Sequence, residues 1–220
     1  MKFFIMMAVL LISSCQSSSK TDNAGNIIEL SVSKTNSQII TTESTPEKYK
    51  TLSVLERAAL ANEQAVRLEP SKFTELPQKI IKNLEERGCT VPQTWHDKNL
   101  HNAISGEFSR KGQKDWAVLC SVDKISSILI FWNSSTGKVA EIGKTDDLGY
   151  FQGVTGDGEM GFSRGIYTVD KKYIIDHYNS YGGTKPPQID HEGINDAYVE
   201  KASTVMYLHR GRWLELQGAD

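Results

Sequence analysis

The residues best suited to chemistry in this 220-residue chain lie in one short acidic stretch. Asp190, His191 and Glu192 are consecutive, and Asp196 follows a few residues later. A carboxylate beside a histidine can orient the imidazole as a general base, provided that a nucleophile lies in reach. His177 is a second histidine with an acidic neighbour. His191, His177 and Asp190 are therefore the catalytic candidates, and they would serve a secreted hydrolase.

A working hydrolase site needs more than these side chains. His191-Glu192 lacks the second histidine of the H-E-x-x-H zinc motif, because Asn195 stands at that position. Neighbouring residues of a strand point to opposite faces, which weakens Asp190 and His191 as a working pair. We therefore expect a non-enzymatic binding or envelope-accessory protein, with the hydrolase that uses the Asp190–Asp196 region as the alternative.

The same stretch has the spacing of a metal loop. Asp190, Glu192 and Asp196 alternate around Gly193, and calcium requires several oxygen ligands of this kind. The alternative is a turn in which Asp190 and Asp196 accept hydrogen bonds from backbone N–H groups. The sequence favours the turn, so we expect no metal and no other cofactor.

A spacing of glycine, aspartate and valine occurs twice, as Gly112-x-x-Asp115-x-x-Val118 and as Gly193-x-x-Asp196-x-x-Val199. With Gly106-x-Phe108 before the first copy, it resembles the FG-GAP repeats of β-propellers, whose acidic loops bind calcium. In the first copy Arg110 and Lys111 occupy acidic positions of that loop and would repel a cation. A propeller needs at least about four blades, so the resemblance implies turn architecture alone.

A broader resemblance covers most of residues 70–220. It rests on short segments that occur in a fixed order: Arg87-Gly88-Cys89, Pro92-Gln93, Asp115–Ser121, Tyr181-Gly182-Gly183, Gly211-Arg212-Trp213-Leu214 and Gly218-Ala219-Asp220. In this order the chain resembles a group of uncharacterised bacterial exported proteins. The resemblance implies a shared fold and carries no activity.

The N-terminus is typical of an exported protein. Lys2 precedes an apolar run from Phe3 to Ile12, which as a helix would rise about 15 Å against roughly 30 Å of membrane hydrocarbon. This length is typical of a signal peptide. Ile12-Ser13-Ser14-Cys15 then resembles a bacterial lipobox, which implies a lipoprotein signal peptide over residues 1–14 and a palmitate-bearing Cys15. An ordinary secretory signal cleaved near Ser14, or a buried apolar helix, is the alternative.

Localisation follows from the same resemblance. Gln16 stands where an aspartate tends to retain such lipoproteins at the inner membrane. The expected place is therefore the cell envelope, lipid-anchored, with the outer membrane facing the periplasm favoured. Residues 15–48 are rich in Ser, Thr, Asn and Lys and predict a flexible tether.

Cysteine usage agrees with an oxidising compartment. With Cys15 acylated, Cys89 and Cys120 remain, and two isolated cysteines in such a compartment most often pair. A zinc site would need two further soft or imidazole ligands at finger-like spacing, and the chain has no C-x-x-C motif. The sequence predicts a Cys89–Cys120 disulfide.

The elements that position these residues predict a single α+β domain over residues 49–220. Apolar periodicity predicts one helix within 49–68 and another from Pro77 to Gly88. Residues 89–220 read as mostly antiparallel strands, with hairpins at 116–132 and 204–216 and a short helix after Asp170. We expect the N-terminal helices of 49–88 to pack on this mostly antiparallel β-sheet, stapled by the disulfide.

Composition limits the partners. The 25 Lys and Arg residues against 27 Asp and Glu, with no basic run, argue against a nucleic-acid binder. Five aromatic side chains could line a sugar- or peptide-binding groove, or could be core packing: Tyr178, Tyr181, Tyr198, Tyr207 and Trp213. The expected partners are the membrane, through the lipid, and an envelope protein, peptide or glycan.

Overall fold

The computed structural model describes residues 49 and 51–219, which belong to one compact unit. The predicted signal peptide, the lipid-attachment residue Cys15 and the predicted tether lie outside the described residues. In the described part, no helix is long and apolar enough to cross a membrane.

The first main sheet is an antiparallel meander in the order β3-β4-β5-β6. Its strands are β3 (Ala103–Gly106), β4 (Asp115–Val122), β5 (Ile125–Phe131) and β6 (Val139–Asp146). Asp123 and Lys124 join β4 to β5 with φ values of 50° and 64°. Two left-handed residues suit a tight hairpin, because their twist matches that of the flanking strands. The hairpin predicted here is confirmed.

The second main sheet is also antiparallel, in the order β12-β11-β10-β9. Its strands are β9 (Arg164–Val169), β10 (Gly193–Tyr198), β11 (Ala202–His209) and β12 (Arg212–Gly218). Arg210 and Gly211 form the last turn with φ values of 49° and 77°. The C-terminal hairpin is thus confirmed, and its turn uses the same left-handed geometry as the first.

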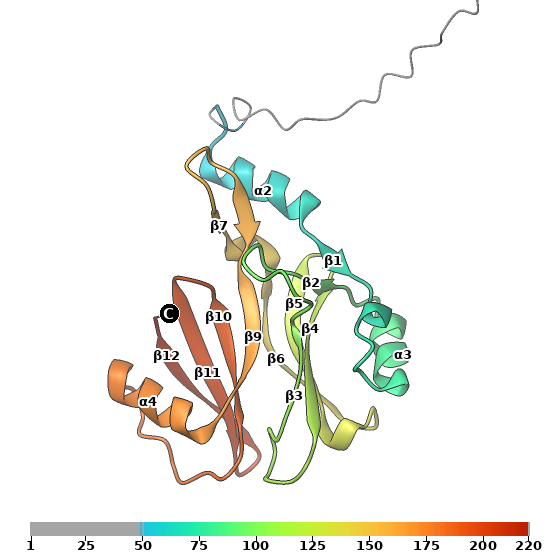
Figure 1. The fold of residues 1–220 in the computed structure, drawn as a ribbon, viewed down its shortest axis with the longest axis vertical. Coiled ribbons are helices and arrows are strands. Elements are labelled where there is room, and N and C mark those ends of the chain that lie inside the picture. The colour runs from blue at the N-terminus through green and yellow to red at the C-terminus, as the bar shows by residue number, and fades with distance from the viewer. Residues whose placement is uncertain (1–48, 50, 220) are drawn as a thin grey trace, which may run out of the picture. The chain divides into compact units, whose positions relative to one another are not determined.

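The two sheets pack face to face, and one helix covers the outer side of each (Figure 1). α3 (Gln78–Glu86) buries Ile80, Ile81 and Leu84 against the outer face of β4 and β5. α4 (Lys171–Tyr181) buries Ile174 against β11 and β12. The prediction of an α+β fold is confirmed, although the helices are not all N-terminal, since α4 follows β9.

The core between the sheets follows from strand alternation. Ala117 and Leu119 of β4 face Ile166, Ile194 and Met206 of the second sheet, while their neighbours on β4 point toward α3. Successive side chains of a strand point to opposite faces, so β4 is buried on both sides. This explains why the sequence from Trp116 to Cys120 is apolar at every position instead of alternating.

Smaller elements close one end of the sandwich. They are α2 (Val54–Gln64), β1 (Arg67–Leu68), η1 (Pro70–Lys72), β2 (Val91–Pro92), η3 (Asp147–Tyr150), β7 (Phe151–Gly153) and β8 (Met160–Phe162). Ser53 caps α2 through a reciprocal pair with Glu56, as a capping box requires. Arg67 donates to the buried Asp147 at 2.9 Å. This ion pair ties β1 to the start of η3.

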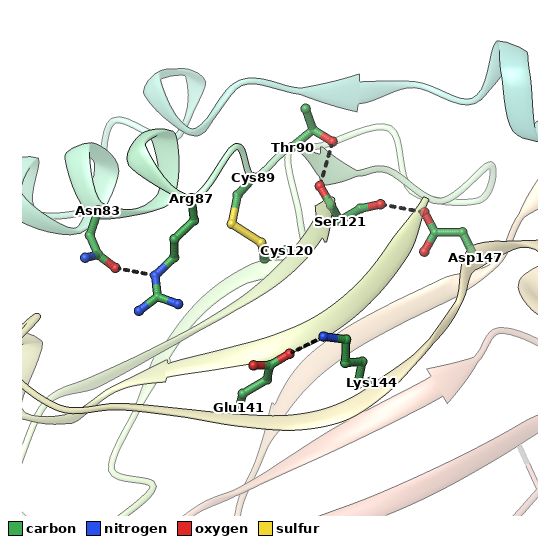
Figure 2. The surroundings of a disulfide bond; sticks show 9 residues. All are labelled: Asn83, Arg87, Cys89, Thr90, Cys120, Ser121, Glu141, Lys144 and Asp147. Carbon is green, nitrogen blue, oxygen red and sulfur yellow. Dashed lines mark hydrogen bonds and ion pairs between the residues drawn. A yellow bond between two sulfur atoms is a disulfide. The ribbon is translucent and has the colours of Figure 1, made fainter. Parts of the chain in front are cut away.

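The disulfide joins Cys89, just after α3, to Cys120 of β4 (Figure 2). Thr90 and Ser121 exchange backbone hydrogen bonds beside it, and the Ser121 hydroxyl donates to Asp147 at 2.7 Å. The predicted pairing is therefore confirmed. It fastens the C-terminal end of α3 to the sheet that this helix covers.

A buried arginine joins the two sheets from within. Arg164 of β9 donates to both carboxylate oxygens of Asp196, at 2.9 and 2.8 Å, and to the Ser126 hydroxyl at 2.8 Å. It also reaches the Gly143 carbonyl at 2.6 Å. Burial alone would lower the pKa of Arg164, but the hydrogen bonds and charge of Asp196 raise that pKa above its ordinary value. Arg164 is therefore a permanent cation.

Candidate functional site

The predicted catalytic residues do not form a common site in the described part of the chain. His177 lies on the buried face of α4 between Tyr173 and Tyr181, with ring centroids 6.1 and 4.9 Å away. His191 precedes β10, and its Nδ1 lies 2.9 Å from the Glu192 carbonyl oxygen. Asp190 is exposed. Among the described residues, no hydrogen bond or ion pair joins His177, His191 and Asp190 to one another.

The chain also carries a serine motif that the search for catalytic patterns in the sequence missed, although its spacing is readable without the structure. Gly161-x-Ser163-x-Gly165 matches the G-x-S-x-G pattern of nucleophile elbows, which place the serine on an exposed strand-to-helix turn. Here Ser163 is fully buried between β8 and β9, and a strand follows it. Its hydroxyl accepts from the Trp95 indole at 3.1 Å and donates to the Gly161 carbonyl at 3.0 Å. The motif is structural in this fold.

The acidic residues considered for calcium have other partners. Asp196 is paired with Arg164, and Glu192 accepts from the Glu107 backbone N–H at 2.8 Å. Within the described residues, no three metal-binding side chains are arranged to hold an ion. The geometry therefore gives the calcium alternative no support, because a cation beside Arg164 would be repelled.

The aromatic set predicted to line a groove is dispersed. Tyr178 and Tyr207 pack in the core beneath α4, Tyr181 contacts His177, and Tyr198 packs on Tyr150. Tyr198 also borders a small hollow of about 170 Å³, and Trp213 lines a larger cleft. Core packing thus accounts for most of the set, as the alternative reading proposed.

The cleft that Trp213 lines lies where the two main sheets end, next to the β11–β12 turn. It has a volume of about 600 Å³. Trp132, which follows β5, and Trp213 of β12 stack with ring centroids 6.0 Å apart and planes inclined by 23°. Each sheet thus contributes one indole to the cleft, and both side chains are half-buried.

Asp115 fixes the wall of this cleft that the first sheet provides. Its carboxylate is fully buried. It accepts from the Ser109 N–H at 2.9 Å, from the Gln113 amide at 2.7 Å and from the Asn133 N–H at 2.7 Å. The Asp115 carboxylate therefore holds the loop before β4 and the turn after β5 together. It provides hydrogen-bond acceptors for donors that would otherwise lack a partner.

The lining of the cleft is positively charged. Arg110 and Lys138 are exposed there, and Gln113 and Ser109 supply uncharged polar groups. Among the described residues, no aspartate or glutamate lines the cleft. Arg110 and Lys138 take part in none of the ion pairs formed between described residues. An anionic group that entered would meet cations not already neutralised.

A second hollow lies at the other end of the sandwich, between α2 and β8. It has a volume of about 460 Å³ and is lined by apolar side chains that include Trp95 and Leu100. Asp97, Lys98 and Glu159 also line it, so charges of both signs are mixed there. This lining defines no particular ligand chemistry.

No family model, no curated protein and no solved structure matches this chain. The resemblance to bacterial exported proteins and to FG-GAP turns therefore stays a prediction from the sequence. The function must be argued from the geometry of the chain itself.

Proposed function

We propose that this protein is a lipid-anchored bacterial envelope protein whose folded part binds a ligand without transforming it. The ligand site is the cleft lined by Trp132 and Trp213. The observation that carries the proposal is a cleft built from both sheets, with two indoles, two cations and no carboxylate among the described residues that line it. Its volume of about 600 Å³ lies in the range of small-molecule sites.

The envelope location rests on the N-terminal sequence, and the Cys89–Cys120 disulfide supports it. Such bonds persist in oxidising compartments such as the periplasm. The lipid anchor is tested by labelling cells that express the full chain with palmitate. Cys15→Ser should abolish the label, and undiminished labelling would overturn the anchor.

Binding in the cleft is tested by fluorine NMR of the chain grown with fluorotryptophan. The protein has four tryptophans, and two of them, Trp95 and Trp116, lie outside the cleft. They serve as internal controls. The probes are chitotetraose, tetragalacturonic acid and an alanine tripeptide, each at millimolar concentration.

We expect at least one probe to shift the Trp132 and Trp213 signals while the Trp95 and Trp116 signals stay in place. Mass spectrometry of the recovered probe should show it unchanged, because a protein that only binds its ligand does not transform it. If no probe moves the two cleft signals, the cleft is not a binding site. Cleavage of a probe would favour the hydrolase, for which no arrangement of the described residues provides support.

A further inference from the structure

The charge of the cleft identifies the class of ligand, if the proposed binding function holds. We propose that the cleft binds an anionic saccharide, whose sugar ring packs on the indoles of Trp132 and Trp213 while its carboxylate or sulfate group pairs with Arg110 and Lys138.

The positive charge extends beyond the lining. Lys111 follows Arg110 in the loop before β4, and Arg210 and Arg212 flank Gly211 in the β11–β12 turn. All three are exposed, and none of them forms an ion pair with another described residue. These three residues are the sequence neighbours of Arg110, Gly211 and Trp213, which line the cleft. A low-dielectric wall focuses their field and raises the local concentration of anions.

The carboxylate of Asp115, two residues from the lining residue Gln113, does not cancel that charge. Asp115 is fully buried, and both of its oxygens are occupied by the Ser109, Gln113 and Asn133 donors. Gln113 is held in place by the same contacts, since its amide also donates to the Ser109 hydroxyl at 2.7 Å. The polar groups of the cleft are therefore positioned before any ligand arrives, which lowers the entropic cost of binding.

The two indoles favour a ligand that contains a sugar ring. An aromatic face offers a large, rigid apolar surface, and the C–H face of a pyranose is its natural complement, whereas a single inorganic anion makes no use of it. A flat anionic membrane would meet the exposed arginines but would not enter a concave cleft. The combination of indoles and cations therefore favours an acidic sugar over either alternative.

The test compares tetragalacturonic acid with its fully methyl-esterified form, in which each carboxylate becomes an uncharged methyl ester. Binding to the full chain is followed by calorimetry and by the fluorotryptophan signals of Trp132 and Trp213. We expect the acid to bind at least about tenfold more tightly than the ester, the factor for one hydrogen bond to a charged group. Its affinity should fall between about 0.05 M and about 0.5 M salt, because salt screens exposed charges.

Charge-reversal variants locate the effect. Arg110→Glu and Lys138→Glu should each weaken binding of the acid by about tenfold or more and leave the affinity for the ester nearly unchanged. Both residues are exposed, so the fold should survive. Lys72→Glu, at an exposed position of η1 that does not line the cleft, is the matched control and should bind like the unaltered chain.

The outcomes separate this inference from the proposed function. If acid and ester shift the Trp132 and Trp213 signals with equal affinity, the cleft binds saccharides but its charge selects nothing, and the inference is wrong. If neither ligand moves these signals, the saccharide inference fails, and the tripeptide result alone decides whether the cleft binds a ligand. If anionic phospholipid vesicles bind and the acid does not, the basic surface serves a membrane and the inference is overturned.

Discussion

Replacing the buried arginine between the sheets is the sharpest test of the fold. In Arg164→Met the apolar stem remains, but Asp196 loses its bidentate partner, and the Ser126 and Gly143 carbonyls lose a donor. The side chain of Arg164 is fully buried and that of Asp196 is 8% exposed. Water therefore has little access to the lost contacts, although Asp196 borders a hollow of about 170 Å³.

The expected loss is about 3–5 kcal/mol of unfolding free energy, as for a buried ion pair that loses one partner. For a domain of this size that corresponds to a melting temperature lower by about 6–20 °C. The assay is urea unfolding followed by far-UV circular dichroism. Arg87→Met, on an exposed arginine that bonds Asn83, is the matched control and should change stability little.

The double variant Arg164→Met/Asp196→Leu distinguishes the pair from simple loss of packing. It leaves no buried charge, so it should be more stable than Arg164→Met alone, and the cycle gives the coupling energy of the pair. A free energy for Arg164→Met within about 1 kcal/mol of the unaltered chain would refute the reasoning, because it would mean that water reaches Asp196.

Three further predictions concern other buried groups. Cys89→Ala/Cys120→Ala should lower the free energy of unfolding by about 4 kcal/mol in the chain-entropy model for a sequence separation of 31, measured by urea unfolding; an unchanged midpoint would contradict it. Asn102 bonds the Pro92 carbonyl, the Arg164 carbonyl and the Ile166 N–H with its φ at 68°. Asn102→Ala should therefore cost about 3 kcal/mol or more, and Asn102→Gly about 1 kcal/mol less, since glycine adopts this φ freely; equal losses would argue against backbone strain. Burial, aided by the charge of Asp196, raises the pKa of Tyr150 above its ordinary value. The neutral Tyr150 hydroxyl therefore contributes its full stabilisation below the unfolded pKa of about 10. That contribution is lost as the pH rises through the folded pKa. Tyr150→Phe should lessen the loss of unfolding free energy between about pH 9 and about pH 11, and an equal loss in both proteins would show that Tyr150 is not the titrating group.

Local signals in the sequence predicted the local elements well. Pro77 and Gly88 bracket α3, and Gly88 indeed adopts a left-handed φ of 73° at its end. Asp170 accepts from the Tyr173 N–H at 2.7 Å and caps α4. Caps and tight turns depend on a few neighbouring residues, so their chemistry is visible in the sequence.

The candidate site was predicted much less well. Trp213 belongs to the aromatic set that the sequence offers for a groove, but its partner Trp132 lies about eighty residues away in sequence and on the other sheet. Ser163 shows the converse, because its G-x-S-x-G spacing is that of a nucleophile while its buried position excludes the role. Spacing along the chain reports local geometry, and says nothing about which distant segments meet.

The sequence by itself determined the helices, the hairpins and the disulfide. It also pointed to the acidic residues of the Asp190–Asp196 region as candidates for catalysis or metal binding. Tertiary structure decided that the strands form two sheets, that Asp196 belongs to Arg164, and that indoles from both sheets meet at one cleft beside two cations of the first sheet. The physical reason is the distance along the chain over which each interaction acts. Backbone propensities and turns act over a few residues, whereas the partner of a buried charge or an aromatic ring is set by packing between segments far apart in the chain.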